Sequence, residues 1–205
     1  NSSGNTHYAM TAEVEISAIN HAGRYGSFLA RPMEEQGAPE VPVAERVAAG
    51  AHRIKLLATG IINFERGAVT AKPQMPAAEL TQFAAAARAH GRQTMVHCSG
   101  NDGVANCIAA RVDSIEHGYF IDDDQLAQLR DLDLAWVPTF APFQYQVDHA
   151  SQLGWSNVVR DNLRRILDGH AGRLVRAAQR GVRVVAGSVS GSHVVPHGWG
   201  FLQEL

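Results

Sequence analysis

The chain has 205 residues, of which 45% are hydrophobic and 19% charged, and its formal net charge is −2. This composition is typical of a globular domain with one sizeable core. The balanced charge predicts no binding surface for nucleic acid or an anionic membrane, and no apolar run approaches the roughly 20 residues of a membrane span. We therefore expect a small-molecule ligand, no nucleic-acid or membrane partner and, since no charged-then-apolar leader opens the chain, a cytoplasmic location.

The amino-terminal part predicts one strand and a long loop. Residues 11–18 alternate between apolar and polar side chains, as a half-buried strand does. Gly- and Pro-rich sequence at 23–42 predicts a surface loop, followed by a short helix at 43–49. His21, Arg24 and Tyr25 follow the first strand and are candidates for holding a polar group of a substrate. The alternative is that they are ordinary side chains of a Gly-rich loop.

From residue 53 onward, predicted strands and helices alternate. Strands are predicted at 53–58, 93–97, 112–116, 134–138 and 182–186. Helices are predicted at 76–90, 102–111, 123–130 and 156–180, with Asp122 and Gln125 as a capping box before the third and an insert at 139–155. Such alternation predicts a parallel α/β sheet with right-handed crossovers. With the amino-terminal strand, six strands are visible.

Two histidines close neighbouring strands of this pattern. His97 and His117 are separated by one strand–helix unit, so the topology brings both imidazoles to the same edge of the sheet, where they can share a metal ion. The alternative is a pair of unrelated core or surface histidines. Glu116 is interpreted as a structural carboxylate at the strand end. Cys98 points away from His97, so we expect a small core residue rather than a catalytic thiol.

A lysine in one strand and the small residues at the end of another add to the order of motifs along the chain. Lys55 lies inside an otherwise apolar strand, and the last predicted strand ends Gly187-Ser188-Val189-Ser190-Gly191. Lysine, histidine, Glu-His-Gly and this strand end, in that order, resemble the amidohydrolase superfamily of metal-dependent (βα)8-barrel hydrolases. Within this superfamily, the sequence looks most like the branch that contains imidazolonepropionase-like enzymes and Xaa-Pro dipeptidases. The resemblance runs from about residue 53 to 205, and Ile115-Glu116-His117-Gly118 is its most specific string.

The resemblance implies an α/β fold of the (βα)8 TIM-barrel type, and six strands of eight make residues 1–205 one partial barrel domain, truncated at both ends. It also implies one or two zinc ions held by Lys55, His97 and His117, with Lys55 carrying a carbamate derived from CO2. A lysine that snorkels to the barrel mouth is the alternative. The implied reaction is hydrolysis of an amide, carbamate or cyclic-imide C–N bond by an activated water.

Several positions depart from the family pattern. Val189 stands where the resembling enzymes have the aspartate that binds metal and moves the proton, and no His-x-His triplet occurs. Cys98 stands where dipeptidases have a tyrosine that binds the substrate carboxylate. Arg111 replaces a helix-ending glycine, at a cost of about 1 kcal/mol if the backbone is left-handed. Tyr119 and His193 are further candidates for substrate contact; packing and an exposed loop histidine are the respective alternatives.

We therefore expect a metal-dependent hydrolase whose activity is impaired. Two alternatives remain: a non-catalytic barrel remnant that binds a metal or ligand or serves in assembly, and a barrel enzyme that needs no metal. Missing strands leave open sheet edges. We accordingly expect a homo-oligomer or a need for the missing barrel segments.

Overall fold

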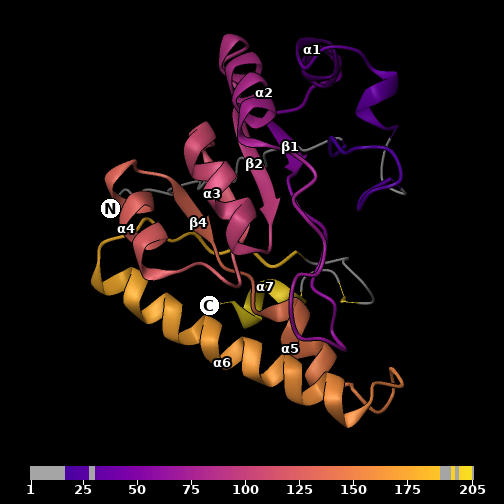
Figure 1. Ribbon diagram of the computed structural model, residues 1–205, viewed down its shortest axis with the longest axis vertical. Helices are drawn as coiled ribbons and strands as arrows, with labels where there is room; N and C mark the ends of the chain where they lie inside the picture. Colours follow the sequence, from indigo (N-terminus) through magenta and orange to yellow (C-terminus); the bar gives the residue numbers. More distant parts are fainter. Residues whose placement is uncertain (1–16, 28–30, 190–194, 197–198, 205) are drawn as a thin grey trace, which may run out of the picture.

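The computed structural model describes residues 17–27, 31–189, 195–196 and 199–204. Its centre is a parallel sheet of β1 (Arg53–Leu57), β2 (Gln93–Cys98), β3 (Ser114–His117) and β4 (Ala135–Val137), in sequential order (Figure 1). The crossovers are α2 (Ala77–Ala89), α3 (Asn101–Ala110) and α4 (Asp123–Asp131). The predicted alternation of strands and helices is confirmed for this part of the chain.

At each edge of the sheet, a single bridge continues the parallel order. Ile19 pairs with Leu56 of β1, and Val184 pairs with Trp136 of β4. The predicted strand at 182–186 is thus shorter than expected. Among the described residues it pairs on one side only, through two backbone hydrogen bonds with Trp136. Of the strand predicted at 11–18, only residues 17 and 18 are described. The described residues form six successive positions of an open barrel-type sheet.

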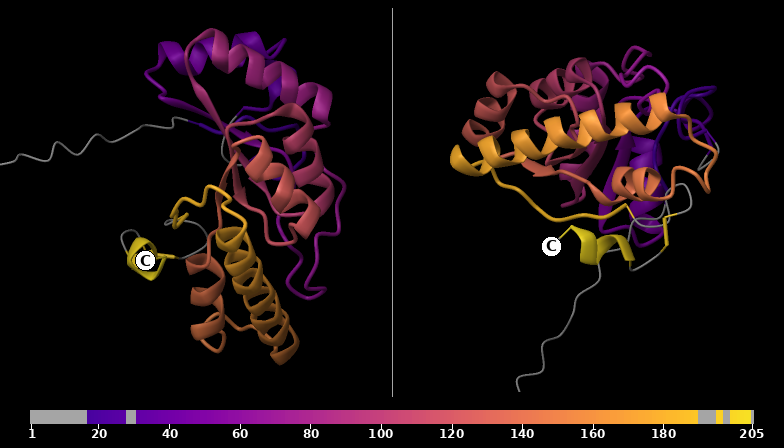
Figure 2. Two further views of the ribbon diagram at one scale, coloured as in Figure 1. Left: turned by 90° about the vertical axis from the view of Figure 1, so that its left-hand side faces the viewer. Right: turned by 90° about the horizontal axis from the view of Figure 1, so that it is seen from below.

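The outer face of the sheet carries the main hydrophobic core. Side chains alternate between the two faces of a strand, and the outward residues share one core with residues of α2 and α3. These two helices cover the outer face of the sheet (Figure 2). The helices contribute residues at helical spacing, as the sequence predicts. The shared core contains Ile54, Leu56, Val96, Cys98, Ile115 and Trp136 from the strands and Leu80, Phe83, Val104, Cys107 and Ile108 from the helices.

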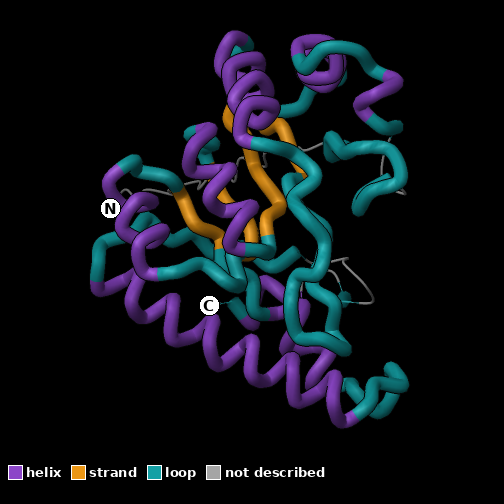
Figure 3. The backbone as a smooth tube through the Cα atoms, in the orientation of Figure 1, coloured by secondary structure: helices purple, strands orange, loops and turns teal. Residues whose placement is uncertain are grey.

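The remaining helices lie at the two ends of the sheet. η1 (Met33–Glu35) and α1 (Glu40–Ala48) occupy the segment that we predicted as a loop and a shorter helix. α5 (Ala141–Asp148), α6 (Asn157–Gln179) and α7 (Trp199–Gln203) gather near the carboxyl ends of the strands (Figures 1 and 3). α5 lies within the predicted insert, and Pro142 stands in its first turn, where the missing N–H costs nothing.

The sequence signals for helix ends are largely confirmed. Asp122 and Gln125 form the predicted capping box of α4, and the Ser156 hydroxyl accepts a hydrogen bond from the backbone N–H of Val159 at the start of α6. Among the described residues, no helix has the length and hydrophobicity needed to cross a membrane.

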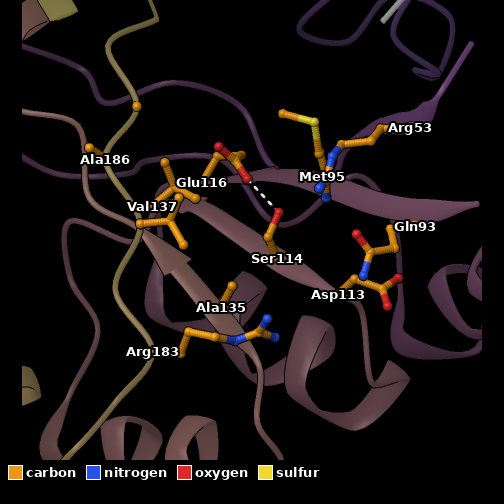
Figure 4. A pocket seen from close by; sticks show the side chains of 12 residues that line it. Arg53, Gln93, Met95, Asp113, Ser114, Glu116, Ala135, Val137, Arg183 and Ala186 are labelled. Atoms are coloured by element: carbon orange, nitrogen blue, oxygen red, sulfur yellow. Dashed lines mark hydrogen bonds between the residues drawn. The ribbon is translucent and has the colours of Figure 1, made fainter. Parts of the chain in front are cut away.

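The inner face of the sheet borders a cavity of about 290 Å³ (Figure 4). In a closed barrel, this space is filled by side chains from all the strands. Glu116, which lines it, accepts a hydrogen bond of 2.6 Å from the hydroxyl of Ser114, as expected for a structural carboxylate. His97 and His117 do not line this cavity. We therefore interpret it as the interior of an open barrel rather than as a substrate pocket.

Candidate functional site

The rings of His97 and His117 lie side by side at the carboxyl ends of β2 and β3. Their centroids are 4.7 Å apart at an interplanar angle of 69°, and both residues are buried. The predicted meeting of the two imidazoles is therefore confirmed. Catalytic residues of barrel proteins gather at this end of the strands.

The backbone at the end of β3 brings His117 to this position. In the sheet register, His97 pairs with Glu116, so strict alternation would place the next residue, His117, on the opposite face. His117 instead has φ of +73°, in the left-handed region, and its ring contacts His97. Gly118 follows with φ of +57°, and a Cβ there would lie 2.7 Å from the Trp136 indole nitrogen. The left-handed backbone at the end of Glu-His-Gly thus turns the His117 side chain toward His97. Left-handed conformations strain residues other than glycine, and such strain is common at functional sites.

Both imidazoles are held neutral. Burial, reinforced by the charge of Lys55, lowers the pKa of His97 to about 3. Burial also lowers the pKa of His117 well below its usual value, and His97, Lys55 and His170 act in the same direction. Neutral imidazole is the form that binds a metal.

Lys55 lies on β1, two strand positions before Leu57, which pairs with His97. Lys55 itself pairs with Met95, and its side chain is half-buried. Its charge acts in the same direction as burial, lowering the pKa of both histidines. The structure therefore brings His97 and His117 together, and metal binding by Lys55 with them stays a prediction. Among the described residues, no cluster of three His, Cys, Asp or Glu side chains is suited to a metal.

A polar network extends from His117 to the end of β4. The Nδ1 atom of His117 lies 2.6 Å from Oγ1 of Thr139, and the hydroxyl of Tyr119 donates a hydrogen bond of 2.7 Å to the Thr139 carbonyl. Tyr119 also stacks parallel to His117, at 5.9 Å between centroids. Sequence analysis missed Thr139. Its position directly beyond a strand end, where barrel site residues gather, is the signal that would have indicated it.

His170 of α6 is a second residue that sequence analysis missed. It is fully buried, and its ring packs against Tyr119, Trp136 and Phe140. Neither ring nitrogen has a hydrogen-bond partner among the described residues. Burial lowers its pKa to about 3. The available signal was a histidine at helical spacing within the apolar stripe of Leu163, Ile166 and Leu167.

The residues predicted to contact substrate in the loop after Ile19 lie in different surroundings. Tyr25 stands at the site, with its ring 4.9 Å from that of His97. His21 is bound between two carboxylates, with Nδ1 2.5 Å from Glu34 and Nε2 2.9 Å from Glu79, which raise its pKa against the effect of burial. Exposed Arg24 donates to the backbone carbonyl of Lys72. Substrate contact by His21, Arg24, Tyr25 and Tyr119 stays a prediction, and His193 lies outside the described residues.

Two residues that depart from the family pattern have a left-handed backbone conformation. Arg111, the C-cap of α3, has φ of 52° and ψ of 52°, as predicted for a residue standing in place of glycine. Val189 has φ of +46°, a region that β-branched residues rarely adopt and that aspartate tolerates better. Cys98 is buried in the core beneath α3, and burial raises the pKa of its thiol, which agrees with the predicted core role.

Comparison with known proteins identifies the family. The model of the amidohydrolase family matches residues 6–195. The chain belongs to the amidohydrolase family. An uncharacterized protein of Mycobacterium tuberculosis (strain ATCC 25618 / H37Rv) is 28% identical over 194 residues, which cover 90% of this chain and 50% of that protein. This chain therefore spans about half the length of its curated relatives.

Solved structures agree with this assignment. A Xaa-Pro dipeptidase with methionine bound in its active site is 26% identical, with a TM-score of 0.63, and the match covers 86% of this chain and 46% of the dipeptidase. Ochratoxinase from A. niger, at 23% identity and a TM-score of 0.63, matches over 78% of this chain and 35% of its own. At 23% identity, the similarity to ochratoxinase shows a shared fold only. The described residues therefore form part of a TIM barrel of the amidohydrolase family.

Proposed function

We propose that this chain carries the metal-binding part of a hydrolase that cleaves amide or related C–N bonds, with Lys55, His97 and His117 holding zinc. The observation that supports this most directly is the pair of buried, neutral imidazoles 4.7 Å apart at the strand ends. A small-molecule substrate and a cytoplasmic location are part of the proposal.

The donor set fits zinc when Lys55 is counted. Two neutral imidazoles supply two nitrogen ligands, and a tetrahedral catalytic site needs a third protein ligand. A carbamate on Lys55 would supply an oxygen: the amine attacks CO2, an N–C bond forms, and a proton is released. The modification exchanges a costly half-buried cation for an anion suited to one or two ions. When bound, zinc would lower the pKa of a water molecule on it and polarise the substrate carbonyl that this water attacks.

Aromatic side chains pack around the two histidines. Tyr25 contacts His97. Tyr119 stacks on His117 and packs against Phe143. The Xaa-Pro dipeptidase relative suggests an N-acyl amino acid, yet this chain has Cys98-Ser99-Gly100 where dipeptidases place a carboxylate-binding tyrosine. We therefore propose the C–N bond class and leave the leaving group open.

A non-catalytic barrel remnant that binds metal or ligand, or serves in assembly, is the second candidate. Val189 favours it, because valine can neither bind metal nor accept the proton that hydrolysis requires. Both candidates place the open sheet against a further barrel segment or a second copy of the chain, since an exposed strand edge pairs readily.

Zinc binding by the full chain tests the proposal. The chain is incubated with zinc and bicarbonate, dialysed, and analysed for metal content and for the mass of a carbamate on Lys55. We expect stoichiometric zinc that is lost in His97→Ala and His117→Ala but kept in His90→Ala, whose side chain is exposed. A chain that binds no zinc would overturn the metal site. Hydrolysis of N-acyl amino acid amides by the zinc-loaded chain then separates the hydrolase from the remnant.

A further inference from the structure

The hydroxyl groups around His117 make hydrogen-bond contacts that only one arrangement of protons can satisfy in full. From their geometry we infer that Thr139, supported by Tyr119, is a positioning residue that holds the proton of His117 on Nδ1 and leaves Nε2 as the nitrogen with the free electron pair. This inference rests on the proposed metal site, because it states which nitrogen of His117 is available to zinc.

Three contacts define the network. The Nδ1 atom of His117 lies 2.6 Å from Thr139 Oγ1, Tyr119 Oη lies 2.7 Å from the Thr139 carbonyl oxygen, and the two hydroxyl oxygens are 3.2 Å apart. All three residues are buried. Since water does not compete there, each contact needs a hydrogen from one of the three side chains.

Counting hydrogens decides the tautomer. A carbonyl oxygen only accepts, so the single hydroxyl hydrogen of Tyr119 is used on the Thr139 carbonyl. The contact between the two hydroxyls then requires the hydrogen of Thr139. Thr139 has no second hydrogen to donate to His117, so the bond of 2.6 Å requires a hydrogen on Nδ1. In the opposite tautomer, one of the three bonds is lost, which corresponds to a bias of roughly two- to tenfold.

His97 provides a contrast within the same site. Its Nε2 atom lies 3.3 Å from the carbonyl oxygen of Gly60, which can only accept. His97 therefore carries its hydrogen on Nε2, and the neighbouring imidazoles have opposite tautomers. A partner on the second ring nitrogen is the usual way in which a protein fixes a metal-binding histidine.

The fold holds Thr139 and Tyr119 in place independently of His117. Thr139 is fully buried just beyond β4, and the ring of Tyr119 packs against that of His170 on α6, with centroids 4.6 Å apart. The ring of Tyr119 packs against Phe143 of α5, with centroids 4.3 Å apart. The network thus joins β3 and β4, and α5 and α6 pack against it.

Long-range proton–nitrogen correlation spectra of the full chain, labelled with ¹⁵N-histidine and free of metal, test the inference. Spectra are recorded near pH 7.5, and signals are assigned by their loss in His97→Gln and His117→Gln. We expect the Nδ1–H pattern for His117 and the Nε2–H pattern for His97. Thr139→Val should move His117 toward the other tautomer by roughly two- to tenfold and leave His97 unchanged, whereas Thr139→Ser keeps the native pattern.

Two results would overturn the inference: an Nε2–H pattern for His117 in the native chain, or an unchanged His117 in folded Thr139→Val. Should the valine variant not fold, the native spectrum and Tyr119→Phe, which frees the Thr139 hydrogen for Nδ1, remain decisive. Tyr119→Phe should give a mixture of the two tautomers, and an unchanged His117 there would also refute the network. A native chain with the expected tautomers that binds no zinc would refute the proposed metal site and leave this inference standing.

Discussion

Acidification should destabilise this protein through its buried histidines. The pKa values of His97 and His170 are about 3 in the folded chain, against about 6.5 in an unfolded one. The unfolded state therefore binds more protons, and stability falls as pH drops through 6.5. Between pH 7.5 and 5.5, each of these histidines lowers the free energy of unfolding by about 1.4 kcal/mol, or about 3 kcal/mol together. His117, with its lowered pKa, adds a loss of the same sign.

His21 acts in the opposite direction. Its pKa is raised by Glu34 and Glu79, so the stability that it contributes is fully present below the unfolded pKa and is lost as pH rises through the folded pKa. Because His21 is partly exposed, solvent screening weakens this gain, and the net change on acidification remains a loss.

Urea unfolding followed by tryptophan fluorescence at pH 7.5 and 5.5 measures the difference. His170→Phe should reduce it by about 1.4 kcal/mol, because one of the titrating groups is removed. His90→Gln, at an exposed position, should leave the difference in place. A pH difference below about 1 kcal/mol, or an unchanged difference in His170→Phe, would refute the buried neutral state of these rings.

Three further substitutions test local features of the chain. At pH 7.5, His170→Phe should raise the free energy of unfolding by about 1 kcal/mol in urea titrations, because buried nitrogens without partners among the described residues are replaced by an apolar aromatic ring. A loss of stability would indicate a missed hydrogen-bond partner. Arg111→Gly should add about 1 kcal/mol at its left-handed position, whereas Arg111→Ala, which keeps a Cβ, should add little; equal effects would show that backbone strain is not the cause. Val189→Asp should raise zinc affinity, measured by metal competition, and restore hydrolysis only when an amino-terminal His-x-His segment is also supplied; full activity of the unmodified chain would contradict the role assigned to this position.

The parallel α/β fold could be predicted because its signals are local. Strand and helix periodicity, the capping box at Asp122 and the apolar stripe of α6 each depend on residues that are near one another in sequence. The helix α5 was missed because one of its buried positions, Gln146, is polar, so the sequence shows no clear apolar stripe at helical spacing. The strand at 182–186 was overestimated, because β propensity does not reveal how many neighbours a strand has, and the described residues supply a neighbour on one side only.

The candidate site, like the fold, could be predicted only in part from the sequence. The strand-end rule predicted that His97 and His117 meet, which the contact between their rings confirms. The sequence could not reveal how His117 reaches its neighbour, because alternation along β3 would have placed it on the opposite face. His170 and Thr139 were missed for a related reason: their roles come from tertiary contacts with Tyr119, a residue 51 positions from the first and 20 from the second.

The turn at the end of β3 connects the fold to the chemistry. His117 and Gly118 both have positive φ, and the close approach of the Trp136 indole to Gly118 excludes a larger residue there. The indole also holds the His117 carbonyl, while Thr139, three residues farther along the same strand and loop, holds the ring. The backbone and the side chain of His117 are thus positioned by one neighbouring strand. A change in β4 should therefore alter His117 before it alters His97, whose ring is held from the other side by the loop after β1.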